Sequence, residues 1–143
     1  MQEYSKRGVT KFNAEILANN LAAHTIHIIK NKKYFSDEVQ QAMSPEIIKL
    51  VLDLAGKVNR ANRIFISHTD EQQAIEAHKK RIELEDEAIE MCDILLDRIT
   101  TLRLAFHLKM SKAAPWARMT KETRAGIKSW QNYEKRELAR LVK

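Results

Sequence analysis

Two histidines, His24 and His27, stand three positions apart in an amphipathic segment and are the residues best suited to metal chemistry. This spacing would place both imidazoles on one side of a helix, where they could share a metal ion. A di-iron bundle also needs Glu-x-x-His motifs on two helices, and the chain contains none. We therefore predict no metal site and no cofactor, and we interpret His24 as an inner-face histidine with a polar partner.

A second candidate for chemistry is the segment RIFISH, which runs from Arg63 to His68. An Arg and a His separated by four residues resemble the motif of the HEPN helical ribonucleases, in which such a pair attacks an RNA backbone. That family usually has a polar residue after the arginine, whereas Ile64 follows it here. The other interpretation is a helix end, where the dipole favours a cationic histidine. The ribonuclease is kept as an alternative.

The other reactive residue types form no catalytic pattern. Cys92 is the only cysteine, falls on the inner face of a helical segment, and is expected to be packed rather than nucleophilic. There is no Gly-rich phosphate loop and no Ser/His/Asp ordering. We predict that the protein is not an enzyme. A lone cysteine and the lack of an apolar run of about 20 residues indicate a cytoplasmic protein without membrane contact.

The last segment, TKETRAGIKSWQNYEKRELARLVK, contains many cations and has a Trp and a Tyr in its middle. On a helical wheel the cations gather on one side and Trp130 falls on the other, so Trp130 is interpreted as core and not as a base-stacking platform. The cations remain candidates for contacts with phosphates, which need no aromatic ring. The predicted nucleic-acid-binding residues are Arg60, Arg63, Arg118, Lys121, Arg124, Lys128, Lys135, Arg136 and Arg140.

The charge is divided unevenly along a chain whose net charge is +6. Residues 99–143 hold eleven Lys or Arg and three Glu, whereas residues 70–98 hold ten Asp or Glu and four Lys or Arg. Such asymmetry favours one side that faces a polyanion and another that is acidic. A further alternative is a bundle that binds only protein, with the acidic stretch 83–97 docking a basic partner.

Only three Gly and two Pro occur among 143 residues, which favours a nearly all-helical chain, and the length fits one domain, 1–143. Apolar residues at three- and four-residue steps predict four helices. The first runs over about 10–31, the third approaches 40 residues from Thr69, and the fourth begins at Ser111 or, preferably, at Thr120. We expect an all-α, up-and-down four-helix bundle with a long third helix.

Four local features of these helices can be checked. Ser44 as N-cap and Pro45 at the first helical position predict the start of the second helix, whose inner stripe extends to Phe65. Gly56 within that stripe predicts a close approach of two helices. The third helix should begin with a capping box formed by Thr69 and Gln72. Polar residues on its inner seam, His78 and Glu85, predict that its first half protrudes or packs loosely.

The order of these features resembles the four-helix-bundle proteins of the accessory variability determinant (Avd) type, found in diversity-generating retroelements. It is also similar to their relatives encoded in intervening sequences of bacterial 23S rRNA genes. The resemblance runs from about Phe12 to Arg136. It rests on HTIHIIKNKKYFSDE, IIKLVLDLAGKVNRAN, EAIEMCDILLDRITTLRLAFHL and the two tryptophans of PWAR and KSWQNYEKR.

This resemblance implies a small, basic, non-enzymatic bundle that assembles into a pentameric ring. Such a protein associates with the reverse transcriptase of its element and with template RNA, and it is needed for mutagenic copying. The basic residues of the fourth helix, with Arg60 and Arg63 of the second, would match the cationic surfaces of the family. The acidic first half of the third helix departs from the family pattern.

Overall fold

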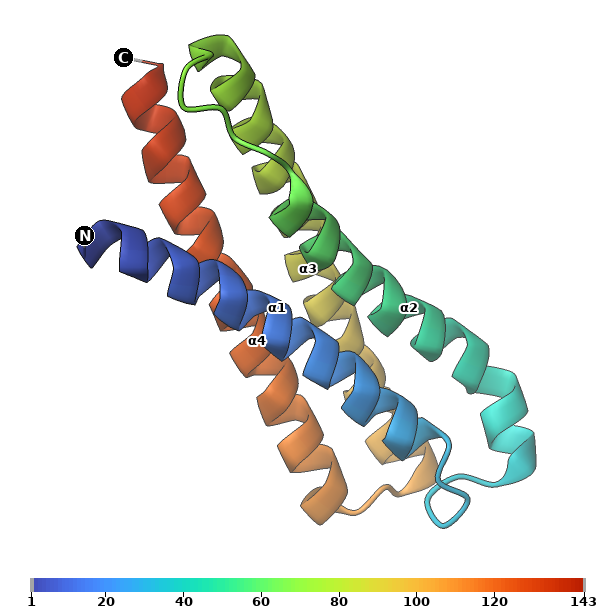
Figure 1. Ribbon diagram of the computed structural model, residues 1–143. Coiled ribbons are helices and arrows are strands. Elements are labelled where there is room, and N and C mark those ends of the chain that lie inside the picture. Colours follow the sequence, from blue (N-terminus) through green and yellow to red (C-terminus); the bar gives the residue numbers. More distant parts are fainter. Residues whose placement is uncertain (1, 143) are drawn as a thin grey trace.

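The computed structural model describes the backbone of residues 2–142 and the side chains of residues 11 and 13–142. Four helices account for most of this range: α1 (Gln2–Ile29), α2 (Asp37–Arg63), α3 (Glu71–Phe106) and α4 (Met110–Leu141). They run alternately up and down and form a four-helix bundle, in which α3 is the longest helix (Figure 1). The predicted fold class is confirmed.

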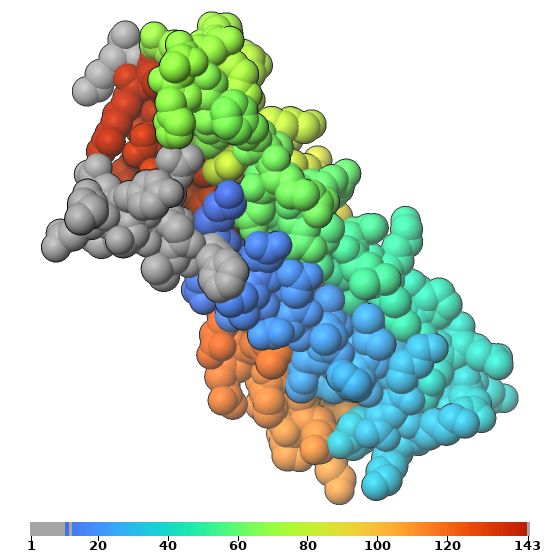
Figure 2. Space-filling model, viewed as in Figure 1, coloured from blue at the N-terminus to red at the C-terminus, as the bar shows by residue number. Residues whose placement is uncertain are grey.

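Each helix packs against the one before and after it, and α4 also packs against α1, which closes the bundle. The α1–α2 and α3–α4 connections lie together at the lower end of Figure 1, which we name the two-loop end, and Figure 2 shows their atoms adjoining there. The α2–α3 connection lies beside the end of α4 at the opposite, one-loop end. Within the described residues, no helix carries an apolar stretch long enough to cross a bilayer.

The second helix begins eight residues earlier than predicted. Ser36 is its N-cap and accepts a hydrogen bond from the backbone N–H of Val39 at 3.3 Å, and two acidic residues follow in the first turn. Ser44 and Pro45 lie inside the helix, so the prediction of a start there is wrong. A helix tolerates one proline when the packing of its neighbouring turns outweighs the lost hydrogen bond, and Ser44 and Ile47 are both buried here.

The third helix begins one residue later than predicted. Asp70 is the N-cap and accepts from the N–H of Gln73 at 3.1 Å, while the side-chain oxygen of Gln73 accepts the N–H of Ser67 at 2.7 Å. These two hydrogen bonds replace the predicted box of Thr69 and Gln72. Because α2 already ends at Arg63, Phe65 is not part of an inner stripe and is 72% exposed.

The fourth helix begins at Met110, so the predicted starts at Ser111 and Thr120 are wrong, the second by ten residues. His107, with φ of 57°, takes the left-handed conformation that ends α3, and Lys109 is the next N-cap. Thr120 is fully buried and donates its hydroxyl hydrogen to the carbonyl of Trp116 at 2.9 Å. Pro115 lies inside α4.

The core follows the predicted inner faces in the middle of the bundle. Cys92, Ile127 and Trp130 are fully buried, as expected, and Trp116 adds a second buried indole whose N–H donates to Thr25 at 2.9 Å. The close helix approach occurs at another glycine than predicted. A Cβ on Gly126 would lie 2.7 Å from Leu17, whereas a Cβ on Gly56 would meet nothing within 4 Å.

The first half of α3 is packed and does not protrude, which corrects a further prediction. His78, Arg81 and Glu85 are buried between α3 and α4, at the one-loop end of the bundle. Their partner is Glu134 of α4, which accepts hydrogen bonds from His78 and, at 2.7 Å, from Arg81. The indole N–H of Trp130 donates to the same carboxylate at 3.0 Å. Polar residues on the inner faces of α3 and α4 thus hydrogen-bond with one another, and the two helices stay packed there.

Candidate nucleic-acid interface

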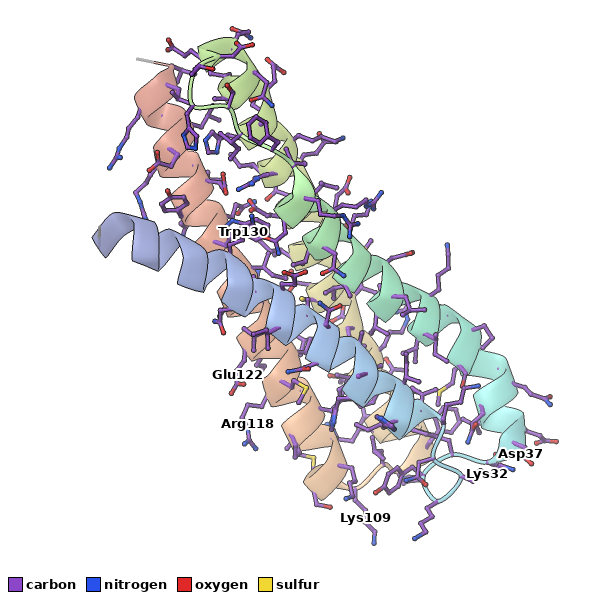
Figure 3. The ribbon with its side chains drawn as sticks, viewed as in Figure 1. Lys32, Asp37, Lys109, Arg118, Glu122 and Trp130 are labelled. Atoms are coloured by element: carbon purple, nitrogen blue, oxygen red, sulfur yellow. The ribbon has the colours of Figure 1, made fainter. Side chains whose placement is uncertain are left out.

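α4 presents the predicted cations on its outer side because its inner side is fully occupied. Trp116, Thr120, Thr123, Ile127 and Trp130 are buried at steps of three and four residues. The positions between them face solvent or lie at the edge of the neighbouring helix. Lys121, Lys128 and Lys135 are exposed, and Arg124 is half-buried. The wheel-based separation of cations from Trp130 is therefore confirmed, and Figure 3 shows Trp130 between the helices.

We name these four residues, Lys121, Arg124, Lys128 and Lys135, the stripe of α4. Their side chains differ in their partners. Arg124 donates to both carboxylate oxygens of Asp93 on α3, at 2.8 and 3.5 Å. Lys121, Lys128 and Lys135 form no ion pair with the side chains that the structure describes. Phosphate contacts would cost no existing ion pair at these three lysines, whereas Arg124 would have to share or leave Asp93.

An acidic edge of α3 runs along part of the stripe. Gln131 lies one helical repeat of seven residues from Arg124 and donates to Asp86 at 2.5 Å, and Asp86 is seven residues from Asp93. The two antiparallel helices therefore keep one register over this length. Carboxylates beside a cationic stripe lower its attraction for polyanions. The same contacts engage part of the stretch 83–97 within the chain, where the sequence suggested a surface for a basic partner.

The remaining predicted residues are scattered. Arg118 and Arg136 are exposed on α4 away from α3, and Arg140 lies 3.3 Å from Glu137 of its own helix. Arg60 and Arg63 are exposed in the last turn of α2. Because α2 packs against α1 and α3, it sits diagonally across the bundle from α4. The nine predicted residues do not form one surface.

The fold brings together cations that the sequence analysis left out. Residues 98–118 contain five Lys or Arg and no Asp or Glu, and they fold back at the two-loop end beside Lys30, Lys32 and Lys33. The ammonium of Lys112 lies 5.6 Å from the centre of the Tyr34 ring, and Phe35 meets Phe106 edge-on at 6.3 Å. These contacts hold the two connections side by side. Among the nearby carboxylates, Asp37 pairs with Lys32 at 3.7 Å.

Figure 3 shows how these cations are presented. Lys109 and Arg118 point away from the bundle at the two-loop end, on the side of α4, while Lys32 and Asp37 lie on the side of α2. Both Lys109 and Arg118 are exposed and have no ion pair among the described side chains. The acid-free run 98–118 was a sequence signal that could have identified this end. Its meeting with Lys30, Lys32 and Lys33 depends on the fold.

The RIFISH segment does not gather its two predicted residues around one hollow. His68 is exposed and lines a hollow of about 310 Å³ at the one-loop end together with His78, Glu137 and Arg140. Arg63 is exposed at the end of α2 and is not among the residues that line it. The carbonyl of Ile64 accepts a hydrogen bond from Arg81 at 2.6 Å, so this segment ties α2 to the buried cluster.

The other residues singled out for chemistry are held in place by packing. Burial, followed by the charge of Asp93, raises the pKa of the Cys92 thiol to about 12, which keeps it protonated and unreactive. The ring nitrogen Nε2 of His24 is buried without the polar partner expected for it. Among the described residues, no three His, Cys, Asp or Glu side chains come together as a set of metal ligands.

Glu85 and Glu134 show how burial and neighbouring charge act on similar groups in opposite directions. Burial, followed by the charge of Glu134, raises the pKa of Glu85 to about 9, and neither of its carboxyl oxygens has a hydrogen-bond partner. Burial would also raise the pKa of Glu134, but the hydrogen bond to His78 and the charge of Arg81 outweigh it and lower the pKa. One charged carboxylate therefore serves two basic residues and Trp130.

Comparisons of this chain with models of protein families, with curated proteins and with solved structures found no match.

Proposed function

We propose that this protein is a non-catalytic RNA-binding accessory protein, which binds the RNA backbone through α4 and the two-loop end. The observation that carries the proposal is the set of exposed cations without ion pairs on α4, above all Lys121, Lys128 and Lys135. The acid-free run 98–118 continues this surface toward the two-loop end. Rigid helices hold the cations at fixed spacing, which suits repeated phosphates.

The mechanism of binding is electrostatic and independent of base sequence. Lys and Arg that neutralise phosphates release condensed counterions, so affinity falls steeply as salt concentration rises. Trp130 and Trp116 are fully buried and take no part. Arg124 contributes less than its neighbours because Asp93 already satisfies its guanidinium. Discrimination between base sequences would be small, since no exposed ring on α4 is available for stacking along the lysine stripe.

A triple substitution tests this surface. Changing Lys121, Lys128 and Lys135 to Gln should weaken binding of a single-stranded RNA by about tenfold or more at 0.1 M salt. It should also reduce the slope of log affinity against log salt by about 2, the value for three lost contacts. Fluorescence anisotropy at several salt concentrations measures both quantities, and circular dichroism checks that helicity is kept.

The matched control removes three lysines from other faces. Lys49, Lys79 and Lys80 are exposed on α2 and α3, and their change to Gln alters the net charge by the same amount. This control should lose much less affinity than the α4 triple variant. Equal losses in the two triple variants would mean that only net charge matters, and would overturn the proposed interface.

The biological setting is proposed from the resemblance to Avd-type proteins. In that setting the bundle acts as a scaffold: it assembles into a pentameric ring, holds the template RNA and associates with a reverse transcriptase in mutagenic copying. Exposed apolar side chains that could join copies or a polymerase occur where α3 meets α4, at Leu104 (62% exposed), Phe106 (42%) and Met110 (59%). Light scattering tests the ring: a monomeric mass at micromolar concentration would exclude it.

A further inference from the structure

A hollow of about 280 Å³ opens at the two-loop end, between the last turns of α1, the α1–α2 connection and the first turns of α4. Its size is that of a small ligand group rather than of a whole nucleotide chain. The polar residues that line it come from three segments far apart in sequence. They are His24, His27, Asn31, Tyr34, Ser111 and Lys112.

Six of the eight residues that line this hollow have polar side chains, the other two are Ile28 and Pro115, and no carboxylate lines it. The side-chain oxygen of Asn31 already accepts the N–H of Lys33 at 2.9 Å, which leaves its NH₂ group to donate elsewhere. Lys112 contributes an ammonium, and Ser111 a hydroxyl. Nε2 of His24 is buried with no hydrogen-bond partner. That atom is closed to solvent, so the imidazole that a ligand in the hollow can reach is the exposed one, His27.

The start of α4 adds to the positive potential. Ser111 and Lys112 lie in its first turn, and the N-cap Lys109 makes no side-chain capping hydrogen bond. The N–H groups of Lys112 and Ala113 donate to the carbonyl of Lys109 at 2.9 Å, whereas the N-cap side chain accepts from none of the first N–H groups, and the helix dipole is positive at this end. Together with the side chains of the hollow, this arrangement favours an anion with several oxygens.

We propose that this hollow binds a phosphate monoester group. Its three terminal oxygens can accept from the ammonium, the hydroxyl, the amide and an imidazole at the same time. A phosphate at the end of a chain can turn all three terminal oxygens toward the hollow, whereas a diester has only two unesterified oxygens to offer. Two kinds of molecule carry this group. One is an RNA with a 5′-phosphate, and its binding rests on the proposed function. The other is free phosphate or a nucleotide, whose binding does not rest on the proposed function.

The first experiment titrates the full chain with inorganic phosphate and follows backbone amide and imidazole NMR signals. Signals of residues 24–34 and 110–113 should move together and saturate at millimolar phosphate. Lys112→Gln should weaken this binding by about tenfold, the effect of losing one charge-assisted hydrogen bond. Ser111→Ala provides a second variant, with a smaller loss. Lys79→Gln on α3 is the control and should bind phosphate as the wild type does.

The second experiment compares 5′-phosphorylated and 5′-hydroxyl RNAs of one sequence by anisotropy. A preference of about tenfold for the phosphorylated RNA, lost in Lys112→Gln, identifies the RNA end as the source. The α4 triple variant should keep this preference although it binds both RNAs more weakly, so the two proposals fail separately. Saturable phosphate binding without any end preference assigns the site to free phosphate or a nucleotide. Signals that do not move with phosphate, together with equal affinity for both RNAs, overturn the proposal.

Discussion

The two ends of the bundle use the same kinds of side chain in opposite ways. At the one-loop end, Arg81 and His78 turn inward, and both contact the buried carboxylate of Glu134. At the two-loop end, Lys109, Lys112 and Arg118 face outward or line a hollow, and no carboxylate lies in the run 98–118. The difference teaches that the counter-ion decides what a basic residue does. A cation paired inside the bundle stabilises it, and an unpaired one is left for an external anion.

The largest effect is expected from removing the buried carboxylate at the one-loop end. Glu134→Ala leaves Arg81 and His78 buried without their carboxylate and should cost about 3–5 kcal/mol of unfolding free energy. Urea denaturation measures this loss. Glu134→Gln, which keeps the size of the side chain but not its charge, should fall between the wild type and the alanine variant.

Two controls bracket that result. Glu137→Ala lies one turn further along α4 and removes a carboxylate that pairs with Arg140 near the surface, so it should cost less than about 1 kcal/mol. Arg118→Gln removes an exposed cation from the two-loop end and should stay within about 0.5 kcal/mol of the wild type. If Glu134→Ala lost no more than Glu137→Ala, the contrast between the two ends would not hold.

The second effect concerns pH. Because the pKa of Glu85 is raised from 4.5 to about 9, the folded protein keeps this proton where the unfolded chain has lost it. Stability from this group is therefore complete below about pH 4.5 and declines as pH rises to about 9, by up to about 1.4 kcal/mol per pH unit. Glu85→Gln cannot ionise, so its stability relative to the wild type should increase by roughly 2 kcal/mol between pH 6 and pH 8.

The measurement is a pair of urea titrations at each pH for the wild type and the variant. Glu83→Gln makes the same change at an exposed glutamate of the same helix and serves as the control for the buried position. A Glu85→Gln difference that is the same at pH 6 and pH 8 would show that Glu85 is ionised in the folded protein.

The smallest effect is expected at Arg124, a cation that has a counter-ion but lies at the protein surface. Asp93 pairs with Arg124 at the protein surface, with side chains 52% and 40% exposed, so Asp93→Asn should change stability by less than about 0.5 kcal/mol. The same change frees Arg124 and should strengthen RNA binding by about twofold. Anisotropy at low salt is the sensitive measurement. Weaker RNA binding in Asp93→Asn would mean that the pair positions Arg124 for the RNA instead of competing with it.

Helix periodicity made the fold and the central core predictable. The burial of Cys92, Ile127 and Trp130 follows from apolar residues at three- and four-residue steps, which also separate Trp130 from the lysines of α4. Helix starts were less predictable because several residues can cap. Ser36 followed by two acids competes with Ser44 followed by Pro45, and the packing of Ser44 and Ile47 decides between them.

The buried cluster shows what a single helix cannot reveal. On α3 alone, His78 and Glu85 are polar residues that interrupt an apolar seam. On α4 alone, Glu134 interrupts the apolar face in the same way. Polar residues on the inner faces of two antiparallel neighbours were a signal that could have suggested pairing. Their alignment within hydrogen-bonding distance depends on the register between α3 and α4, which sequence periodicity does not specify.

By itself, the sequence determined an all-helical bundle, the burial of Trp130 and an outer row of cations on the last helix, because these follow from local spacing along one chain. Only the tertiary structure decided which cations are paired. It joined Arg124 to Asp93, enclosed Arg81 with Glu134, and brought Lys112 to the ends of α1 and its connection. The physical reason is that the pairing of a charge depends on distances between separate helices, and those distances are set by packing.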